Sequence, residues 1–140
     1  MDPEPEPEKK MEHALSRGTE TVLFVDDEDA MVNLNRQRLE RLGYTVIPQT
    51  DPSEVLDFFR VHPDEIDLVI TDMTMPHMTG DRFAQEILKI RPSIPIILCT
   101  GYSEKINESR AKELGIRKYI EKPMEKEILA RSVREVLDGP

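Results

Sequence analysis

The segment ETVLFVDDEDAMVNLN, residues 20–35, decides the fold because an apolar run passes directly into four acidic residues. The run Val22 to Val25 is typical of a buried β-strand. The acids at positions 26–29 follow it, and apolar residues with helical spacing come next. These acids either cap the helix that follows, which contributes about 1 kcal/mol, or share their position with a cation.

Length and composition restrict the class of protein. The chain has 140 residues, enough for one domain with a core, with 38% apolar and 34% charged residues. Its formal net charge of −9, with no basic patch, argues against a nucleic-acid partner. No apolar run approaches the length of a membrane span, so no membrane contact of its own is predicted. A single cysteine, Cys99, fits a reducing compartment, and the chain lacks a secretory signal, so we expect a cytoplasmic location.

The first 20 residues differ from the rest in composition. They alternate proline with glutamate and lack aromatic residues. Such a segment cannot bury enough apolar surface to offset the entropy of ordering it. We therefore expect a disordered lead or linker over residues 1–20 and one domain over residues 21–140.

From residue 21 onward, short apolar runs alternate with segments of helical period. Strands are predicted at 21–25, 45–49, 67–71, 95–100 and 118–122. Helices are predicted from the inward-facing residues Met31, Val32, Leu34, Leu39 and Leu42, then 52–59, 83–90, 106–114 and 128–137. Gly43 and Gly115 end two of these helices, and Asp51-Pro52 begins another. The alternation predicts an α/β fold, a single doubly wound five-stranded parallel sheet with helices on both faces.

In such sheets, ligands bind at the carboxyl ends of the strands. The first strand delivers Asp26 and Asp27 to that edge, and the third ends at Asp72. The fourth ends at Thr100 and the fifth at Lys122. Each residue alone has an ordinary explanation, but together they predict a site of three carboxylates, a hydroxyl and an ammonium.

The chemistry of this set favours phosphoryl transfer. Three crowded carboxylates repel one another unless a cation neutralises them. Oxygen ligands without His or Cys favour a hard divalent ion, and a partial protein shell suits Mg²⁺. Asp72 is then the candidate nucleophile toward phosphorus, with Lys122 and Thr100 contacting the phosphoryl oxygens.

The motifs also resemble a known family. LFVDDE (23–28), VITDMTMPHMTG (69–80), ILCTGY (97–102) and YIEKP (119–123) resemble the motifs of the response regulator receiver domain of two-component signalling. The resemblance covers about residues 21–138. It implies the flavodoxin-like strand order 2-1-3-4-5.

The resemblance implies a role for each site residue. Asp72 corresponds to the phospho-accepting aspartate and Lys122 to the lysine that contacts the phosphoryl group. Asp27 would bind Mg²⁺ directly, Asp26 mostly through water, and Thr74 through its backbone carbonyl, with Asp72 completing the metal ligands.

Further positions concern switching. Thr100 resembles the switch hydroxyl and Tyr119 the switch aromatic residue. Lys122-Pro123 resembles the position of a cis peptide bond. Thr74 and Tyr102 occupy two variable positions that tune dephosphorylation in the family.

The implied function is that of a phosphoacceptor in a phosphorelay. Asp72 would take a phosphoryl group from the phosphohistidine of a sensor histidine kinase or a histidine phosphotransfer domain and lose it slowly by itself. Phosphorylation would switch a face made by the helix near 103–114, the fifth strand and the last helix, which a downstream effector protein reads. The chain would catalyse its own phosphorylation and would not turn over an external substrate. The stretch ALSRGTETVLFVDDE (14–28) also resembles the join into the C-terminal receiver of hybrid sensor histidine kinases.

Three other functions must be weighed. A flavin-binding protein of this fold would cradle phosphate in its first loop, where four acids repel it. A phosphatase of the haloacid dehalogenase type needs a second acid two residues after its nucleophile, and position 74 is threonine. A receiver-like interaction module that is never phosphorylated remains the main alternative, and the complete residue set argues against it.

Overall fold

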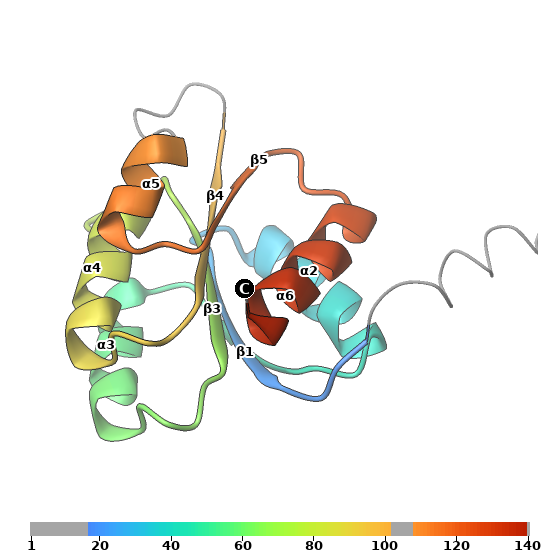
Figure 1. Ribbon diagram of the computed structural model, residues 1–140, viewed down its shortest axis with the longest axis horizontal. Coiled ribbons are helices and arrows are strands. Elements are labelled where there is room, and N and C mark those ends of the chain that lie inside the picture. The colour runs from blue at the N-terminus through green and yellow to red at the C-terminus, as the bar shows by residue number, and fades with distance from the viewer. Residues whose placement is uncertain (1–16, 102–107, 140) are drawn as a thin grey trace, which may run out of the picture.

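Five parallel strands form one sheet in the order β2-β1-β3-β4-β5 in the computed structural model, which describes residues 17–101 and 108–139 (Figure 1). The predicted strand order and the flavodoxin-like architecture are therefore confirmed. The strands are β1 (Thr21–Val25), β2 (Thr45–Gln49), β3 (Leu68–Asp72), β4 (Ile96–Thr100) and β5 (Lys118–Glu121).

Helices cover both faces of the sheet. Helices α3 (Pro52–Val61), α4 (Gly80–Ile90) and α5 (Glu108–Leu114) lie on one face, and α2 (Asp29–Arg41) and α6 (Lys126–Asp138) lie on the other (Figure 1). Among the described residues, no helix combines the length and apolar character needed to cross a membrane.

The core is divided by the sheet into two layers. All five residues of β3 and of β4 are buried, as expected for central parallel strands with helices on both sides. Phe59, Phe83 and Ile87 belong to the layer under α3, α4 and α5. Leu39 and Val133 belong to the layer under α2 and α6. The two layers bury β1, β3 and β4, and the ends of these strands carry Asp26, Asp27, Asp72 and Thr100.

The residues that were predicted to begin and end helices do so in the structure. The Asp51 side chain accepts a hydrogen bond of 2.9 Å from the Ser53 backbone N–H and caps α3, with Pro52 at its first position. Gly43 and Gly115 follow α2 and α5 with φ of 103° and 96°, a conformation that glycine adopts without strain.

One inward-facing residue of the first helix was predicted wrongly. Leu34 is 42% exposed, whereas Asn35 next to it is only 1% exposed. The apolar pattern assigned Leu34 to the core because it considered only apolar side chains. The buried stripe of the helix runs through Val32, Asn35, Leu39 and Leu42, so an amide occupies a core-facing position between apolar residues.

Three sequence predictions fall wholly or partly outside the described residues. These are the disordered lead over its residues 1–16, Tyr102, and the start of the fourth predicted helix, including Ile106. The boundary after Glu20 stays a prediction. Residues 17–20 already contact the domain, because the Gly18 N–H donates to the Leu42 carbonyl at 3.1 Å.

Candidate functional site

Three carboxylates meet at the carboxyl edge of the sheet. Asp26 and Asp27 follow β1, and Asp72 ends β3, which pairs with β1 through Val25 and Thr71. One carboxylate oxygen from each of the three acids lies within 4.8 Å of the others. The structure thus brings these predicted site residues together, with oxygen-only ligands that fit a hard divalent cation.

The electrostatics of Asp26 favour a bound cation. Its side chain is 2% exposed, and burial raises its pKa to about 6, with the negative charges of Asp72 and Asp27 adding to the effect. A hydrogen bond of 3.0 Å from the Glu28 N–H to Asp26 Oδ1 opposes the rise. A buried carboxylate among like charges is costly, and a positive ion between the three acids would offset that cost.

Lys122 supplies one positive charge to the same place. Its Nζ lies 2.6 Å from Asp72 Oδ1, and its backbone N–H donates to the Thr100 carbonyl at 2.7 Å. Burial alone would lower the pKa of Lys122, but the hydrogen bond and charge of Asp72 raise it above the usual value. Lys122 is therefore an ammonium directed at Asp72. The peptide bond between Lys122 and Pro123 is cis, as the resemblance predicted.

Thr100 has an unused hydroxyl beside this pair. The residue is fully buried at the end of β4, and its Oγ1 makes no hydrogen bond with the part of the chain that the structure describes. A buried hydroxyl without a partner costs about 1–3 kcal/mol. An oxygen-bearing group added near Asp72 would provide the missing acceptor.

The loop after Asp72 is held close to the strand that carries it. The Met73 N–H donates to the Cys99 carbonyl and the Gly80 N–H to the Met73 carbonyl, both at 2.8 Å. A side chain at Gly80 would overlap the backbone carbonyl of Asp72. Gly80 therefore positions the loop containing Thr74, and apolar periodicity gave no signal for it.

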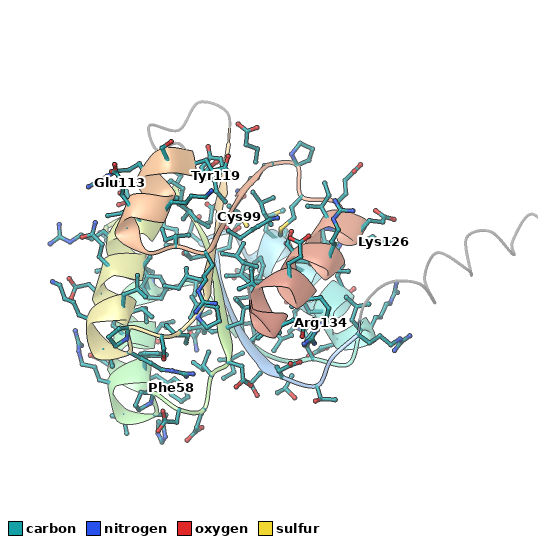
Figure 2. The ribbon with its side chains drawn as sticks, in the orientation of Figure 1. Phe58, Cys99, Glu113, Tyr119, Lys126 and Arg134 are labelled. Carbon is teal, nitrogen blue, oxygen red and sulfur yellow. The ribbon has the colours of Figure 1, made fainter. Side chains whose placement is uncertain are left out.

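Tyr119 and Cys99 lie close to these residues. Tyr119 on β5 is partly buried against the core layer of α4 and α5. Cys99 is buried on β4, where burial raises the pKa of its thiol to about 12, so the reactive thiolate is suppressed. Figure 2 shows Tyr119 on the α5 side of the sheet and Arg134 on the α6 side.

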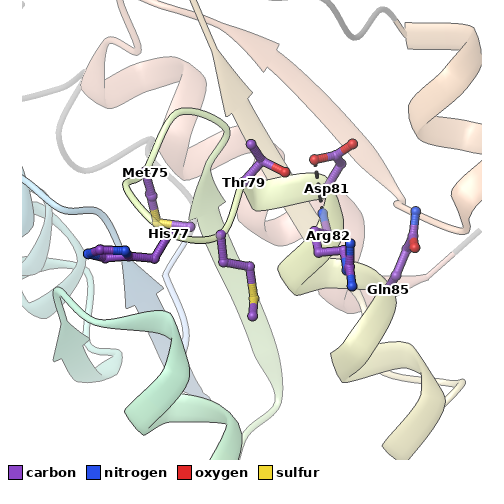
Figure 3. Close-up of a pocket in the computed structure, with 7 residues that line it drawn as sticks. Met75, His77, Thr79, Asp81, Arg82 and Gln85 are labelled. Atoms are coloured by element: carbon purple, nitrogen blue, oxygen red, sulfur yellow. Dashed lines mark hydrogen bonds between the residues drawn. The ribbon is translucent and has the colours of Figure 1, made fainter.

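Two hollows lie near this edge. The smaller one, of about 170 Å³, is lined by Asp26, Asp72 and Lys122 together with residues of α2 and the β5–α6 loop. The larger one, of about 680 Å³, lies over the loop before α4 and the start of that helix (Figure 3). None of its described lining residues belongs to the predicted site, and His77 points away from Arg82 and Gln85. The predicted site residues therefore lie at the smaller hollow.

Comparisons with known proteins agree with this geometry. Residues 22–134 match the family described as response regulator receiver domain. The chain is 33% identical over 132 residues to the sensor kinase CckA of Brucella abortus, covering 94% of this chain and 14% of that protein. It is 36% identical over 119 residues to the probable transcriptional regulator ycf27 of Porphyridium aerugineum, covering 84% and 48%. The chain thus spans about half or less of the length of these curated relatives.

Solved structures show the same similarity. A response regulator receiver domain protein from Clostridium thermocellum superposes with a TM-score of 0.81 at 30% identity, over 85% of this chain and 94% of that one. A CheY-like receiver domain protein from Methanospirillum hungatei superposes with a TM-score of 0.77 at 30% identity, over 86% and 95%. The similarity extends over the whole sheet and its helices.

Proposed function

Because the chain belongs to the response regulator receiver domain family of two-component signalling, as its motifs predicted, we propose that Asp72 is its phosphoacceptor. The observation that carries this assignment is the arrangement around Asp72. An ammonium lies 2.6 Å from its Oδ1, and a buried hydroxyl without a described partner ends the adjacent strand. Few structural roles require both groups beside one carboxylate.

The reaction is a transfer between two nucleophiles. An Asp72 oxygen attacks the phosphorus of a phosphohistidine, forming an O–P bond, and the N–P bond breaks with its electron pair remaining on the histidine nitrogen. The product is an aspartyl phosphate, and water later removes the phosphoryl group slowly. This chain therefore catalyses its own modification and does not turn over an external substrate.

The surrounding residues neutralise and orient the phosphoryl oxygens. Lys122 donates to one oxygen as a point charge, and Thr100 donates its hydroxyl to another. Asp26, Asp27 and Asp72, with the Thr74 backbone carbonyl, would hold Mg²⁺, which supplies positive charge beside the phosphoryl oxygens. The acidic cluster, which can bind a metal ion, supports this part of the proposal.

The donor is a sensor histidine kinase or a histidine phosphotransfer domain, and the recipient of the signal is an effector protein. We expect the effector to contact the face of α5, β5 and α6, which Thr100 and Tyr119 border. The similarity to a sensor kinase over only 14% of its length supports a receiver within a hybrid kinase as one context. The cytoplasm is the location that fits these partners.

The test is the mass gained by the protein with acetyl phosphate and Mg²⁺. The wild type should gain one phosphoryl group that is acid-stable and base-labile. Asp72→Asn, which keeps the size of the side chain, should gain none. Asp64→Asn, an exposed carboxylate in the loop that leads into β3, is the matched control and should behave as the wild type.

Other outcomes identify other functions. Equal mass gain in Asp72→Asn would refute the assignment of the nucleophile. No gain in the wild type with either acetyl phosphate or a phosphohistidine donor would favour an interaction module that is not phosphorylated. A bound yellow chromophore or turnover of a generic phosphate ester would indicate a flavoprotein or a phosphatase.

A further inference from the structure

The loop between β5 and α6, which begins with Lys122, is held at two places. At its start, the Lys122 N–H donates to the Thr100 carbonyl at 2.7 Å. Two residues later, the Met124 carbonyl accepts a hydrogen bond of 2.8 Å from Arg38 Nη1 on α2. The Met124 side chain also contacts the core, with its Sδ 3.7 Å from Cys99 Sγ. Arg38 therefore joins α2 to the loop across 86 residues of sequence.

The buried side chain of Asn35 orients the guanidinium of Arg38. The same Nη1 lies 3.3 Å from Asn35 Oδ1, one helical turn earlier. Asn35 is 1% exposed, and its Nδ2 donates to the Met31 carbonyl at 3.1 Å. A buried amide on a core-facing helix surface is costly unless its hydrogen bonds are made, and here both ends of the amide are used. The pair Asn35 and Arg38 is therefore a built polar network.

The space beside the loop explains why a hydrogen bond is needed there. The hollow of about 170 Å³ extends from Asp72 and Lys122 to Asn35, Arg38 and Met124. Side chains leave this volume open, so the loop is incompletely packed on that side. The bond from Arg38 adds a restraint there.

We propose that Arg38 is a positioning residue for Lys122. By holding the Met124 carbonyl, it fixes the loop that carries Lys122 and keeps Nζ within hydrogen-bond distance of Asp72. Its effect on phosphoryl transfer rests on the function proposed above, whereas its effect on the position of Lys122 does not. A lysine free to move by about 1 Å would contact the phosphoryl oxygens less well, and a displacement of that size slows reactions by up to about 100-fold.

The test compares three variants of two arginines on α2. Arg38→Met keeps the length of the side chain and removes its donors. Arg38→Lys restores one donor that can reach the Met124 carbonyl. Arg36→Met is the control, because the side-chain hydrogen bonds of Arg36 to described residues go to Glu40 and Asn33 on its own helix.

Two measurements are made on each variant. The first is the rate of phosphorylation by acetyl phosphate at saturating Mg²⁺. The second is the NMR signal of the Lys122 ammonium without any phosphodonor, assigned by its disappearance in Lys122→Ala. Arg38→Met should phosphorylate on the order of tenfold more slowly. Its Lys122 signal should move toward those of exposed lysines. Arg38→Lys should recover part of both effects, and Arg36→Met should match the wild type.

The outcomes separate the alternatives. An unchanged Lys122 signal in folded Arg38→Met overturns the proposal, whatever the phosphorylation rate. If the Lys122 signal changes in Arg38→Met but the wild type accepts no phosphate, the positioning role stands and the proposed function is refuted. If Arg38→Met does not fold, Asn35→Leu replaces it, because this variant removes the second partner of the guanidinium. It must show slower phosphorylation and a shifted Lys122 signal, both to a smaller extent.

Discussion

At the scale of single residues, the burial of Asp26 is the clearest consequence of the site. This carboxyl is almost inaccessible to solvent, and two other carboxylates lie close to it. Asp26 contributes nothing to the apolar core, and its ionised form is destabilised in the folded protein. Such a residue is costly to stability, and the proposed metal site would explain its presence.

Asp26→Asn should therefore stabilise the metal-free protein at neutral and alkaline pH. The pKa of Asp26 rises from 3.8 to about 6 on folding, so the folded state binds the proton more tightly than the unfolded state. Stability that this group provides below about pH 4 is lost as the pH rises to about 6. The free energy of unfolding of Asp26→Asn should exceed that of the wild type by up to about 3 kcal/mol at pH 8, less where solvent screens the charge. At pH 3.5 the two proteins should differ little.

Urea unfolding in EDTA at several pH values measures this difference. Asp64→Asn, at an exposed position, should show no comparable gain. Saturating Mg²⁺ should reduce the advantage of Asp26→Asn, because the wild type binds the ion more tightly. A variant no more stable than the wild type at pH 8 would contradict the assigned burial cost.

Residue types at strand ends were predictable, whereas polar contacts between distant elements were not. Asp72, Thr100 and Lys122 were found because parallel strands bring their carboxyl ends to one edge. Arg38 gave no such signal, since its partner is a backbone carbonyl 86 residues away. Gly80 was also missed, because only the folded backbone shows that a side chain there would meet Asp72.

At the scale of elements, α5 has the smallest attachment to the core. Among its described residues Glu108–Leu114, only Ala111 is buried, whereas α6 buries Leu129, Ala130, Ser132, Val133 and Val136. The sequence predicted this difference from the thin apolar stripe of the fourth helix. An element with few buried contacts opens at low free energy cost. This makes α5 the element that phosphorylation can move most easily.

We expect a beryllofluoride mimic of the phosphoryl group to shift a two-state equilibrium of α5. Amide NMR signals should change at Asp72, Thr100, α5 and β5, because Thr100 turns toward the mimic and leaves space for Tyr119. Inverting a ratio of 1:99 requires about 5.5 kcal/mol of differential binding, within reach of several charge-assisted hydrogen bonds.

Thr100→Ala is the variant that tests this coupling. It should confine the shifts to the site, since the moving hydroxyl is gone. Shifts that remain local in the wild type, or that occur mainly on α2, would contradict the role of α5.

Element boundaries followed the sequence closely because their causes are local. The Asp51 cap and the Gly43 stop act within one helical turn, and both were found. The burial of Asn35 was missed because its polar atoms are satisfied by Arg38 and the Met31 carbonyl, contacts that apolar periodicity cannot include.

At the scale of the whole molecule, one arginine joins the start of the described chain to its end. Arg134 on α6 donates to both Glu20 carboxylate oxygens at 3.0 Å and to Asp138 at 2.6 Å. It also lies 3.3 Å from the Tyr44 hydroxyl and from the Arg17 carbonyl. These contacts attach residues 17–20 to α6 and to the turn between α2 and β2.

Two glycines permit this close approach. A side chain at Gly18 would meet Arg134 and Tyr44, and one at Gly43 would meet the Gly18 carbonyl. The composition of residues 1–20 predicted a disordered lead or linker. It could not reveal that the last four residues fit a surface made by three distant segments.

Arg134→Met should therefore destabilise the domain through its N-terminal segment. Because the Arg134 and Glu20 side chains are 19% and 30% exposed, we expect a loss of only about 1–2 kcal/mol in the free energy of unfolding. Removing residues 1–20 should cost a similar amount, whereas removing residues 1–16 should cost little. In the chain that begins at residue 21, Arg134→Met should have a much smaller effect, since its main partner is absent.

Urea unfolding of the full and shortened chains, each with and without Arg134→Met, measures the coupling between Arg134 and the N-terminal segment. The exposed Arg131→Met is the control. Equal effects of Arg134→Met in the long and short chains would show that residues 17–20 contribute nothing through Arg134, and that its contacts with Asp138 and Tyr44 account for the loss.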